Sequence, residues 1–141
     1  MTWSIRAGRT AIAAFALALS VVGVSALAGA AAAQEGNAEE GAEVFKKCRA
    51  CHDVGPAAKN KVGPLLNDII GRKAGTIEGF AYSDANKAAG AKGLVWTEEV
   101  MFKYLENPLT FMPATKMAFA GLKDAQDRKD VIAYLKAAGK K

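Results

Sequence analysis

Residues 46–53 read KKCRACHD, and this octapeptide holds both cysteines and the only histidine of the 141-residue chain. Cys48, Cys51 and His52 stand at positions i, i+3 and i+4, which share one face of a helix. Two thiols and an imidazole on one face can bond to a single flat group. What these three side chains bind therefore decides the fold.

The first 33 residues are predicted to be a cleaved signal peptide. Arg6 and Arg9 precede an uncharged run that extends to Glu35, and small residues in an A-x-A pattern precede a cleavage site after Ala33. A basic start, an apolar centre and small residues before the cleavage site are typical of secretory signals. An uncleaved membrane anchor is the alternative, because the run is long enough to span a bilayer. In both cases residues 34–141 are predicted to form one exported domain in the periplasm.

The exported part has only a mild excess of positive charge. It carries 17 basic and 14 acidic residues and has no arginine-rich run. Since phosphate binding needs clustered cations, nucleic acid is not an expected partner. The lysines can instead lie on one face and attract an acidic protein.

Capping residues and apolar spacing predict an all-α domain with long loops. Four short helices are expected, each preceded by a capping side chain and followed by a stop signal. The caps are Asn37, Ser83, Thr97 and Asp124. The stops are the Lys46–Lys47 turn, Gly90, Pro108 and Gly139, which places the second helix at residues 84–89. Between the first two helices a Gly-, Pro- and Lys-rich stretch predicts a loop with a turn or two at 65–70, and no segment alternates as a strand does.

Such a domain buries too little apolar surface to be stable alone, and small folds of this kind are completed by disulfides, a metal or a large bound group. C-x-x-C-H is the signature of covalent c-type haem attachment. In that chemistry the two thiols add to vinyl groups as thioethers and the histidine ligates the iron. Cys48, Cys51 and His52 then each have a bond to make, and the haem supplies the missing core.

Two other interpretations of the motif are weaker. A thioredoxin-type dithiol or a simple disulfide suits an exported C-x-x-C, but no βαβ pattern surrounds it and His52 is left without a role. A closed zinc site needs four ligands, and the motif supplies three.

A low-spin haem iron also needs a sixth ligand, and with one histidine in the chain a second imidazole is excluded. The thioethers that follow the signal peptide are Met101, Met112 and Met117. Met101 falls on the apolar face of a predicted helix, and Met112 precedes Pro113 and is suited to packing against the macrocycle. Met117 lies in an irregular segment whose backbone freedom would let the sulfur reach iron. The residues alone favour Met117 and leave the other two open.

Five motifs stand in order along the chain: CRACH, VGPLLNDIIGRKAG, GFAYSDANK, YLENPLTFMPATKMAFAG and DVIAYLK. With them the chain resembles class I c-type cytochromes from about Gly36 to Lys140, in particular the bacterial cytochrome c2 group and its mitochondrial relatives. The resemblance implies the cytochrome c fold, with short helices and long loops around one covalently bound haem c. It also implies an electron-transfer protein and not an enzyme.

The resemblance further assigns roles to single residues. Met117, in the T-K-M-x-F segment, would be the sixth iron ligand. Backbone carbonyls at Pro64 would accept a hydrogen bond from the far ring nitrogen of His52. Gly41 and Phe45 would meet residues 131–135 where the first and last helices cross.

Two groups of polar residues are expected around the haem. Those matching positions that hydrogen-bond the propionates are Arg72, Tyr82 and Trp96, with simple core packing as the alternative for Trp96. Those matching a polar cluster beside the methionine sulfur are Asn86, Tyr104 and Thr115. The chain has about three more residues between Asn86 and Trp96 than the mitochondrial form, so the loop geometry there is left open.

The resemblance implies a monomer that accepts electrons from a cytochrome bc complex and passes them to a photosynthetic reaction centre or a terminal oxidase. Lysines that match positions around an exposed haem edge are Lys47, Lys61, Lys116 and Lys123, and they would steer acidic partners. Leu109 and Thr110 stand where relatives often carry lysines, so fewer positive charges are expected on that side of the haem edge. The competing class is a haem enzyme or gas sensor with an open sixth position.

Overall fold

The computed structural model describes residue 1 and residues 35–140. The predicted signal peptide, residues 1–33, and its cleavage site lie outside the described residues, apart from Met1. Five helices form within residues 35–140. They are α1 (Ala38–Phe45), α2 (Asp84–Ala91), α3 (Glu98–Glu106), α4 (Pro108–Phe111) and α5 (Ala125–Ala138). None of the helices in this part of the chain is both long and apolar enough to cross a membrane.

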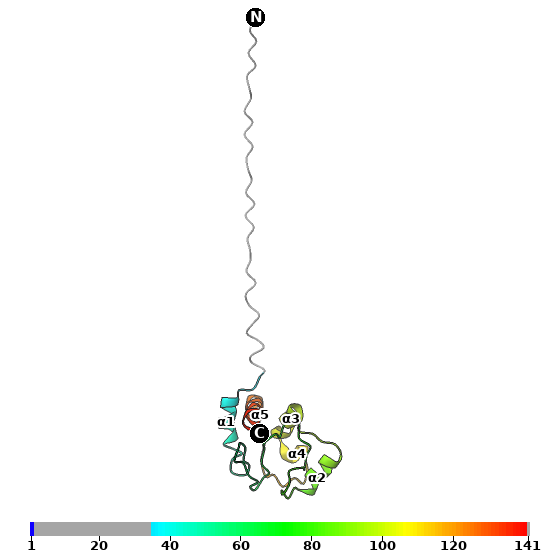
Figure 1. Ribbon diagram of the computed structural model, residues 1–141. Helices are drawn as coiled ribbons and strands as arrows, with labels where there is room; N and C mark the ends of the chain where they lie inside the picture. The colour runs from blue at the N-terminus through cyan, green and yellow to red at the C-terminus, as the bar shows by residue number, and fades with distance from the viewer. Residues whose placement is uncertain (2–34, 141) are drawn as a thin grey trace.

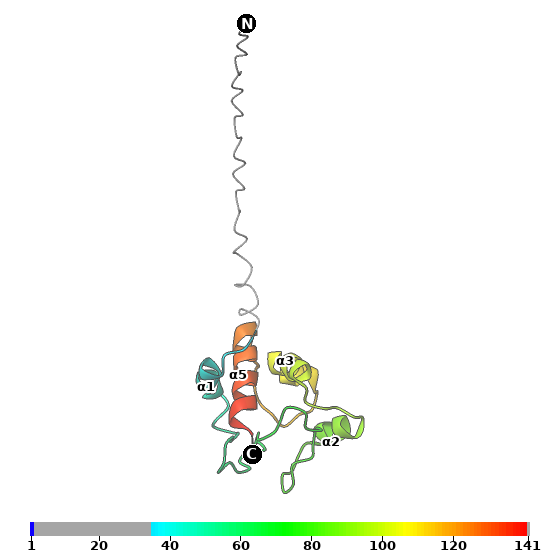
Figure 2. The ribbon, with the colours of Figure 1, turned by 45° about the horizontal axis from the view of Figure 1, so that its top comes forward.

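Helix α5 lies between α1 and α3, and α2 lies on the far side of the domain from α1 (Figures 1 and 2). At the α1–α5 crossing a Cβ at Gly41 would collide with the main-chain carbonyl of Asp130, so only glycine lets the two backbones come this close. Phe45 is buried beside Tyr134, with 5.2 Å between ring centroids. The expected contact between the first and last helices is confirmed.

All four predicted caps are confirmed, because the side chains of Asn37, Ser83, Thr97 and Asp124 each accept a backbone N–H in the first turn of a helix. The end of α5 at Gly139 is confirmed as well.

The stop predicted at Gly90 is wrong, and Pro108 has a role beyond the predicted stop. Helix α2 continues through Gly90 to Ala91. A Cβ at Gly90 would collide with the carbonyl oxygen of Ala74, so this glycine permits a close approach and does not end the helix. Helix α3 ends at Glu106, and Pro108 begins the short helix α4, which was not predicted. Proline is well suited to a first helical position, where its missing N–H would have no partner.

The rest of the described chain is loop. Residues 65–70 form turns as expected, including a hydrogen bond from Ile69 N to Leu66 O of 3.2 Å. Within residues 35–140 the only β pairing is an isolated bridge between Lys73 and Val95. The fold class is therefore all-α, as predicted.

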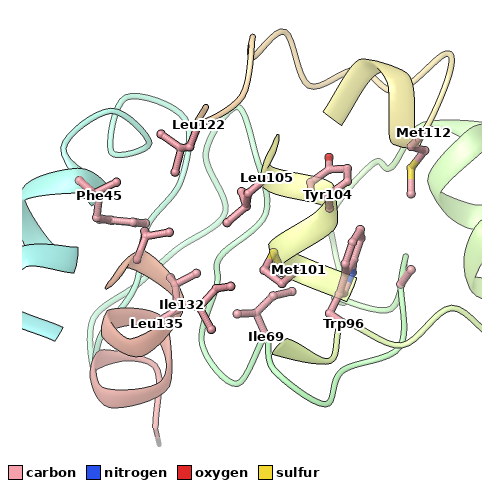
Figure 3. Packing of buried hydrophobic residues seen from close by; sticks show 13 residues of the cluster. Phe45, Ile69, Trp96, Met101, Tyr104, Leu105, Met112, Leu122, Ile132 and Leu135 are labelled. Carbon is pink, nitrogen blue, oxygen red and sulfur yellow. The ribbon is translucent and has the colours of Figure 1, made fainter. Parts of the chain in front are cut away.

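The core combines helical and loop residues (Figure 3). Met101, Tyr104 and Leu105 come from α3, and Val131, Ile132 and Leu135 come from α5. Ile69, Trp96 and Leu122 are buried although they lie in loops. This mixed core surrounds a cavity, which holds the candidate site.

Candidate functional site

The C-x-x-C-H segment continues from the end of α1 as hydrogen-bonded turns. The amides of Cys51 and His52 both donate to the carbonyl of Cys48, at 3.0 and 2.9 Å. The second of these bonds has the i to i−4 spacing of an α-helix, which keeps the three side chains on one side of the turn. Cys48, Cys51 and His52 accordingly line the same cavity.

The ring of His52 has a defined orientation. Its Nδ1 lies 2.8 Å from the carbonyl oxygen of Pro64, and because a carbonyl can only accept, Nδ1 carries the proton and donates. A Cβ at Gly63 would collide with the imidazole, so the backbone packs directly against the ring. Burial lowers the pKa of His52, which favours the neutral imidazole. Nε2 is left with a lone pair that can ligate a metal.

The cavity has a volume of about 330 Å³. Every residue that the sequence predicted for the site lies in its wall. These residues are Cys48, Cys51, His52, Arg72, Tyr82, Asn86, Trp96, Tyr104, Thr115 and Met117. Segments that are far apart in the sequence therefore meet at one site.

Two of the three candidate methionines reach this cavity. Met101 is buried in the core and lines the wall, whereas Met112 lines a separate hollow between α2 and α4. The sulfur of Met117 accepts a hydrogen bond from the Tyr104 hydroxyl at 3.1 Å. Burial raises the pKa of Tyr104, against an opposing effect of Thr115, and keeps the phenol protonated as a donor. Tyr104 therefore holds the Met117 sulfur at the cavity.

The residues predicted to bind the haem propionates lie in the wall, and Arg72 already uses some of its donors within the chain. Arg72 donates to the main-chain carbonyls of Asn67 at 2.8 Å and Leu65 at 3.2 Å. Burial lowers the pKa of Arg72, although an arginine remains charged at neutral pH. Trp96 is buried with its ring 4.8 Å from that of Tyr104, so it takes part in the core, which was the alternative expectation.

The wall fits a large cofactor that is mostly apolar and bears a few polar groups. Most of the lining side chains are apolar. The side-chain oxygen of Asn86 is buried in the wall without a hydrogen-bond partner, and a buried orphan of this kind calls for a polar group of a ligand. Two thiols, an imidazole and a thioether are suitable donors for the covalent attachment and axial ligation of haem iron.

The alternatives to a haem site gain no support. Burial raises the pKa of the Cys48 thiol, which disfavours the thiolate that a thioredoxin-type dithiol needs. No strand, and hence no βαβ unit, forms in residues 35–140. The same residues contain no group of three His, Cys, Asp or Glu side chains placed to hold one metal ion, as zinc would require.

The four predicted docking lysines differ in their surroundings. Lys47 and Lys116 line the cavity, and the Lys47 ammonium pairs with Asp127 at 2.9 Å. The Lys61 ammonium donates to Arg49 O at 2.5 Å, and that of Lys123 donates to Glu106 O at 2.8 Å. Three of the four ammonium groups are thus held by the chain itself.

Several apolar wall residues were not predicted. Val62, Leu66, Ile69, Phe80 and Phe119 all line the cavity. They lie in loops, where no helical or strand period separates inward from outward positions. Their apolar character within a polar stretch of sequence was the only signal that could have indicated a place in the wall. Val62 is 80% exposed although it lines the cavity.

The profile of the cytochrome c family matches residues 38–139. The chain is 58% identical over 106 residues to cytochrome c2 of Blastochloris viridis, covering 75% of this chain and 80% of the relative. It is 60% identical over 97 residues to cytochrome c-550 of Ancylobacter novellus, covering 69% of this chain and 91% of the relative. Among solved structures, cytochrome c2 from Rhodospirillum centenum superposes with a TM-score of 0.71 at 48% identity, covering 74% of this chain and 99% of that one.

Proposed function

Because this chain belongs to the cytochrome c family and is an electron-transport protein with one covalently attached haem c, we propose that His52 and Met117 ligate its iron. Cys48 and Cys51 form the two thioether bonds. The protein is a soluble one-electron carrier of the periplasm, exported by a signal peptide at residues 1–33. It takes electrons from a cytochrome bc complex and passes them to a photosynthetic reaction centre or a terminal oxidase.

The observation that carries this proposal is the presence of Met117 in the cavity that the C-x-x-C-H segment lines. The hydrogen bond from Tyr104 keeps the Met117 sulfur there. A thioether facing the site favours an iron with both axial positions filled. A filled site suits electron transfer, and it disfavours the peroxidase or gas-sensor alternative, which needs an open position.

When bound, the haem supplies an iron that exchanges one electron between its ferric and ferrous states. The chain contributes the surroundings. The apolar wall disfavours the extra charge of the ferric state and so raises the reduction potential. The contacts of His52 with Pro64 and Gly63 limit ring movement, and Tyr104 limits that of the Met117 sulfur. Ligands that move little keep the barrier to electron transfer low.

Partner binding is proposed at the rim of the cavity. Lys47 and Lys116 lie in the wall, and Lys61 and Lys123 are exposed. Lys61 N donates to the carbonyl oxygen of Gly63, which is itself a wall residue. Together the four lysines attract acidic partners and raise the association rate more than the affinity. Such encounters between electron carriers are small and short-lived. The Lys47 ammonium is paired with Asp127, so part of its charge is already neutralised before a partner arrives.

The test is Met117→Ala, with Met112→Leu as a matched control that alters a buried methionine outside the cavity. Met117→Ala is expected to abolish the far-red sulfur-to-iron absorption band of the ferric protein. It is also expected to lower the reduction potential and let the ferrous protein bind carbon monoxide. Met112→Leu should keep the band. If Met117→Ala kept the band, another thioether would be the ligand.

A further inference from the structure

The segment that carries Met117 is a loop between two helices. α4 ends at Phe111 and α5 begins at Ala125, and no helix or strand forms between them. Figure 3 shows Met112 and Leu122 near opposite ends of this loop. We call residues 121–123 the closing arm of the loop. Its attachment limits how far the rest of the loop can move from the cavity.

The closing arm is fastened to the last turn of α3. Leu122 N donates to Leu105 O at 2.7 Å, and Lys123 Nζ donates to Glu106 O at 2.8 Å. These carbonyls lie at a helix end, where they have no partner within the helix. Gly121 has φ +92°, and a Cβ there would collide with the carbonyl of Glu106, so the arm lies directly on α3. Leu122 is itself buried in the core.

Arg128, in the first turns of α5, fastens the same arm from the other side. Its Nη1 donates to Leu122 O at 2.6 Å and to Lys123 O at 3.1 Å. Its guanidinium lies over the ring of Phe102, 4.4 Å from the centroid. Arg128 is only 5% exposed, and no ion pair in residues 35–140 includes it. Burying a cation without a carboxylate is costly, so the bonds to the arm and the contact with Phe102 are what compensate it.

We propose that Arg128 is a positioning residue for Met117. By tying the closing arm to α5, it keeps the loop closed and the Met117 sulfur at the cavity. This inference rests on the proposed ligation by Met117, because it concerns how firmly that ligand is held.

The expected effect follows from competition at one coordination position. An external ligand such as imidazole can bind the ferric iron only when the Met117 sulfur has left. A looser arm lowers the effective concentration of the sulfur, as a longer tether does for any linked group. The apparent affinity for imidazole rises by the same factor. Loss of the charge-assisted bonds to the arm is expected to raise that affinity about tenfold.

The experiment titrates the ferric holoprotein with imidazole and follows loss of the far-red band. The variants are Arg128→Leu, which removes the donors, and Arg128→Lys, which keeps the charge and one donor group. Lys129→Leu is the control, because it removes the same charge from the next residue of α5 and leaves the arm untouched. Arg128→Leu should bind imidazole about tenfold more tightly, Arg128→Lys to an intermediate degree and Lys129→Leu like the parent. If Arg128→Leu does not fold, Arg128→Lys alone decides between a tighter and an unchanged affinity.

A second control distinguishes the proposed positioning role of Arg128 from a general contribution to stability. Val44→Ala removes buried side-chain volume from α1, outside the cavity wall, and lowers the overall stability without touching the arm. It should leave the imidazole affinity unchanged. An Arg128→Leu variant that is less stable but keeps the parental imidazole affinity would overturn the inference. A parent protein without the far-red band would instead overturn the ligation by Met117, so the two failures are distinct.

Discussion

His52 is oriented by contacts with the chain itself. Its Nδ1–H donates a hydrogen bond to Pro64 O, and the backbone at Gly63 packs against the ring. Fixing the tautomer and the ring plane in this way leaves Nε2 as the ring nitrogen available for the proposed iron ligation and limits the freedom that the ring would lose on binding. The acceptor is a backbone carbonyl and not a side chain. A substitution at residue 64 that leaves the backbone conformation unchanged should therefore keep this hydrogen bond.

Tyr104 provides a test at the scale of one hydrogen bond. Its hydroxyl donates to the Met117 sulfur. With Met117 as the proposed ligand, this bond reduces the electron density that the thioether offers to ferric iron. Tyr104→Phe removes the hydroxyl and keeps the ring, so it should stabilise the ferric state. A bond of this strength corresponds to a reduction potential lower by roughly 20–60 mV. Redox titration of the purified protein measures the shift.

Tyr134→Phe is the matched control for that change. Tyr134 packs against Phe45 at the α1–α5 crossing and does not line the cavity. Its substitution should leave the potential where it is. An unaltered potential in Tyr104→Phe as well would mean that the bond to Met117 does not tune the iron.

At the scale of elements, the crossing of α1 and α5 depends on contacts between backbones. Gly41 lets the two helices approach, and Asn37 N donates to the carboxylate of Asp130 at 2.7 Å. Asn37 also caps α1 with its side chain. Asn37 thus caps the start of α1 and joins it to α5.

Gly41→Ala should separate the two helices. The added Cβ would collide with the Asp130 carbonyl and also meet the Tyr134 side chain. The better helix propensity of alanine adds at most about 1 kcal/mol to the free energy of unfolding. The steric cost in a tightly packed contact is larger, so the free energy of unfolding should fall by about 1–3 kcal/mol. Denaturant unfolding, monitored by far-UV circular dichroism, measures it.

Glu40→Ala is the control on the same helix. Glu40 is exposed, so its substitution adds an alanine to α1 without touching α5. Its effect should stay within about 0.5 kcal/mol. Equal stabilities for Gly41→Ala and the parent would show that the crossing has room for a methyl group.

At the scale of the whole molecule, the cavity occupies the place of a core. Its wall takes residues from α1, α3, α5 and the loops between them. Leaving about 330 Å³ unfilled would cost on the order of 8 kcal/mol, taking the measured cost per unit of cavity volume in protein cores. The total stability of a small domain is of similar size, about 5–15 kcal/mol. We therefore expect the bound haem to contribute to the stability of the fold as well as to electron transfer.

The double variant Cys48→Ala/Cys51→Ala tests this dependence by preventing covalent attachment. Once the haem has been extracted, this protein should lose most of its helical circular dichroism and its cooperative thermal transition. Adding haem back should restore both in part, because His52 and Met117 are still present. An extracted protein that stayed helical and melted sharply would mean that the chain has a sufficient core of its own.

Much of the fold was predictable because its signals are local. A capping side chain contacts amides two or three residues away, so Asn37, Ser83, Thr97 and Asp124 marked the helix starts from sequence alone. The C-x-x-C-H spacing likewise placed three donors on one side of a single turn. The resemblance to c-type cytochromes then supplied the other candidate site residues, and all of them line the cavity, although several apolar wall residues were not predicted.

The sequence by itself determined the helix starts, the haem-binding motif and the need for a bound group to complete the core. The tertiary structure alone decided the roles of Gly90, Pro108 and Arg128. A glycine that ends a helix and one that lets another segment approach look the same in sequence, and so do a proline after a helix and one at its first position. The partners of Arg128 lie in a loop without periodicity, and its burial arises only when α3 and α5 close on that loop. Local patterns record contacts along the chain, whereas these roles come from contacts across it.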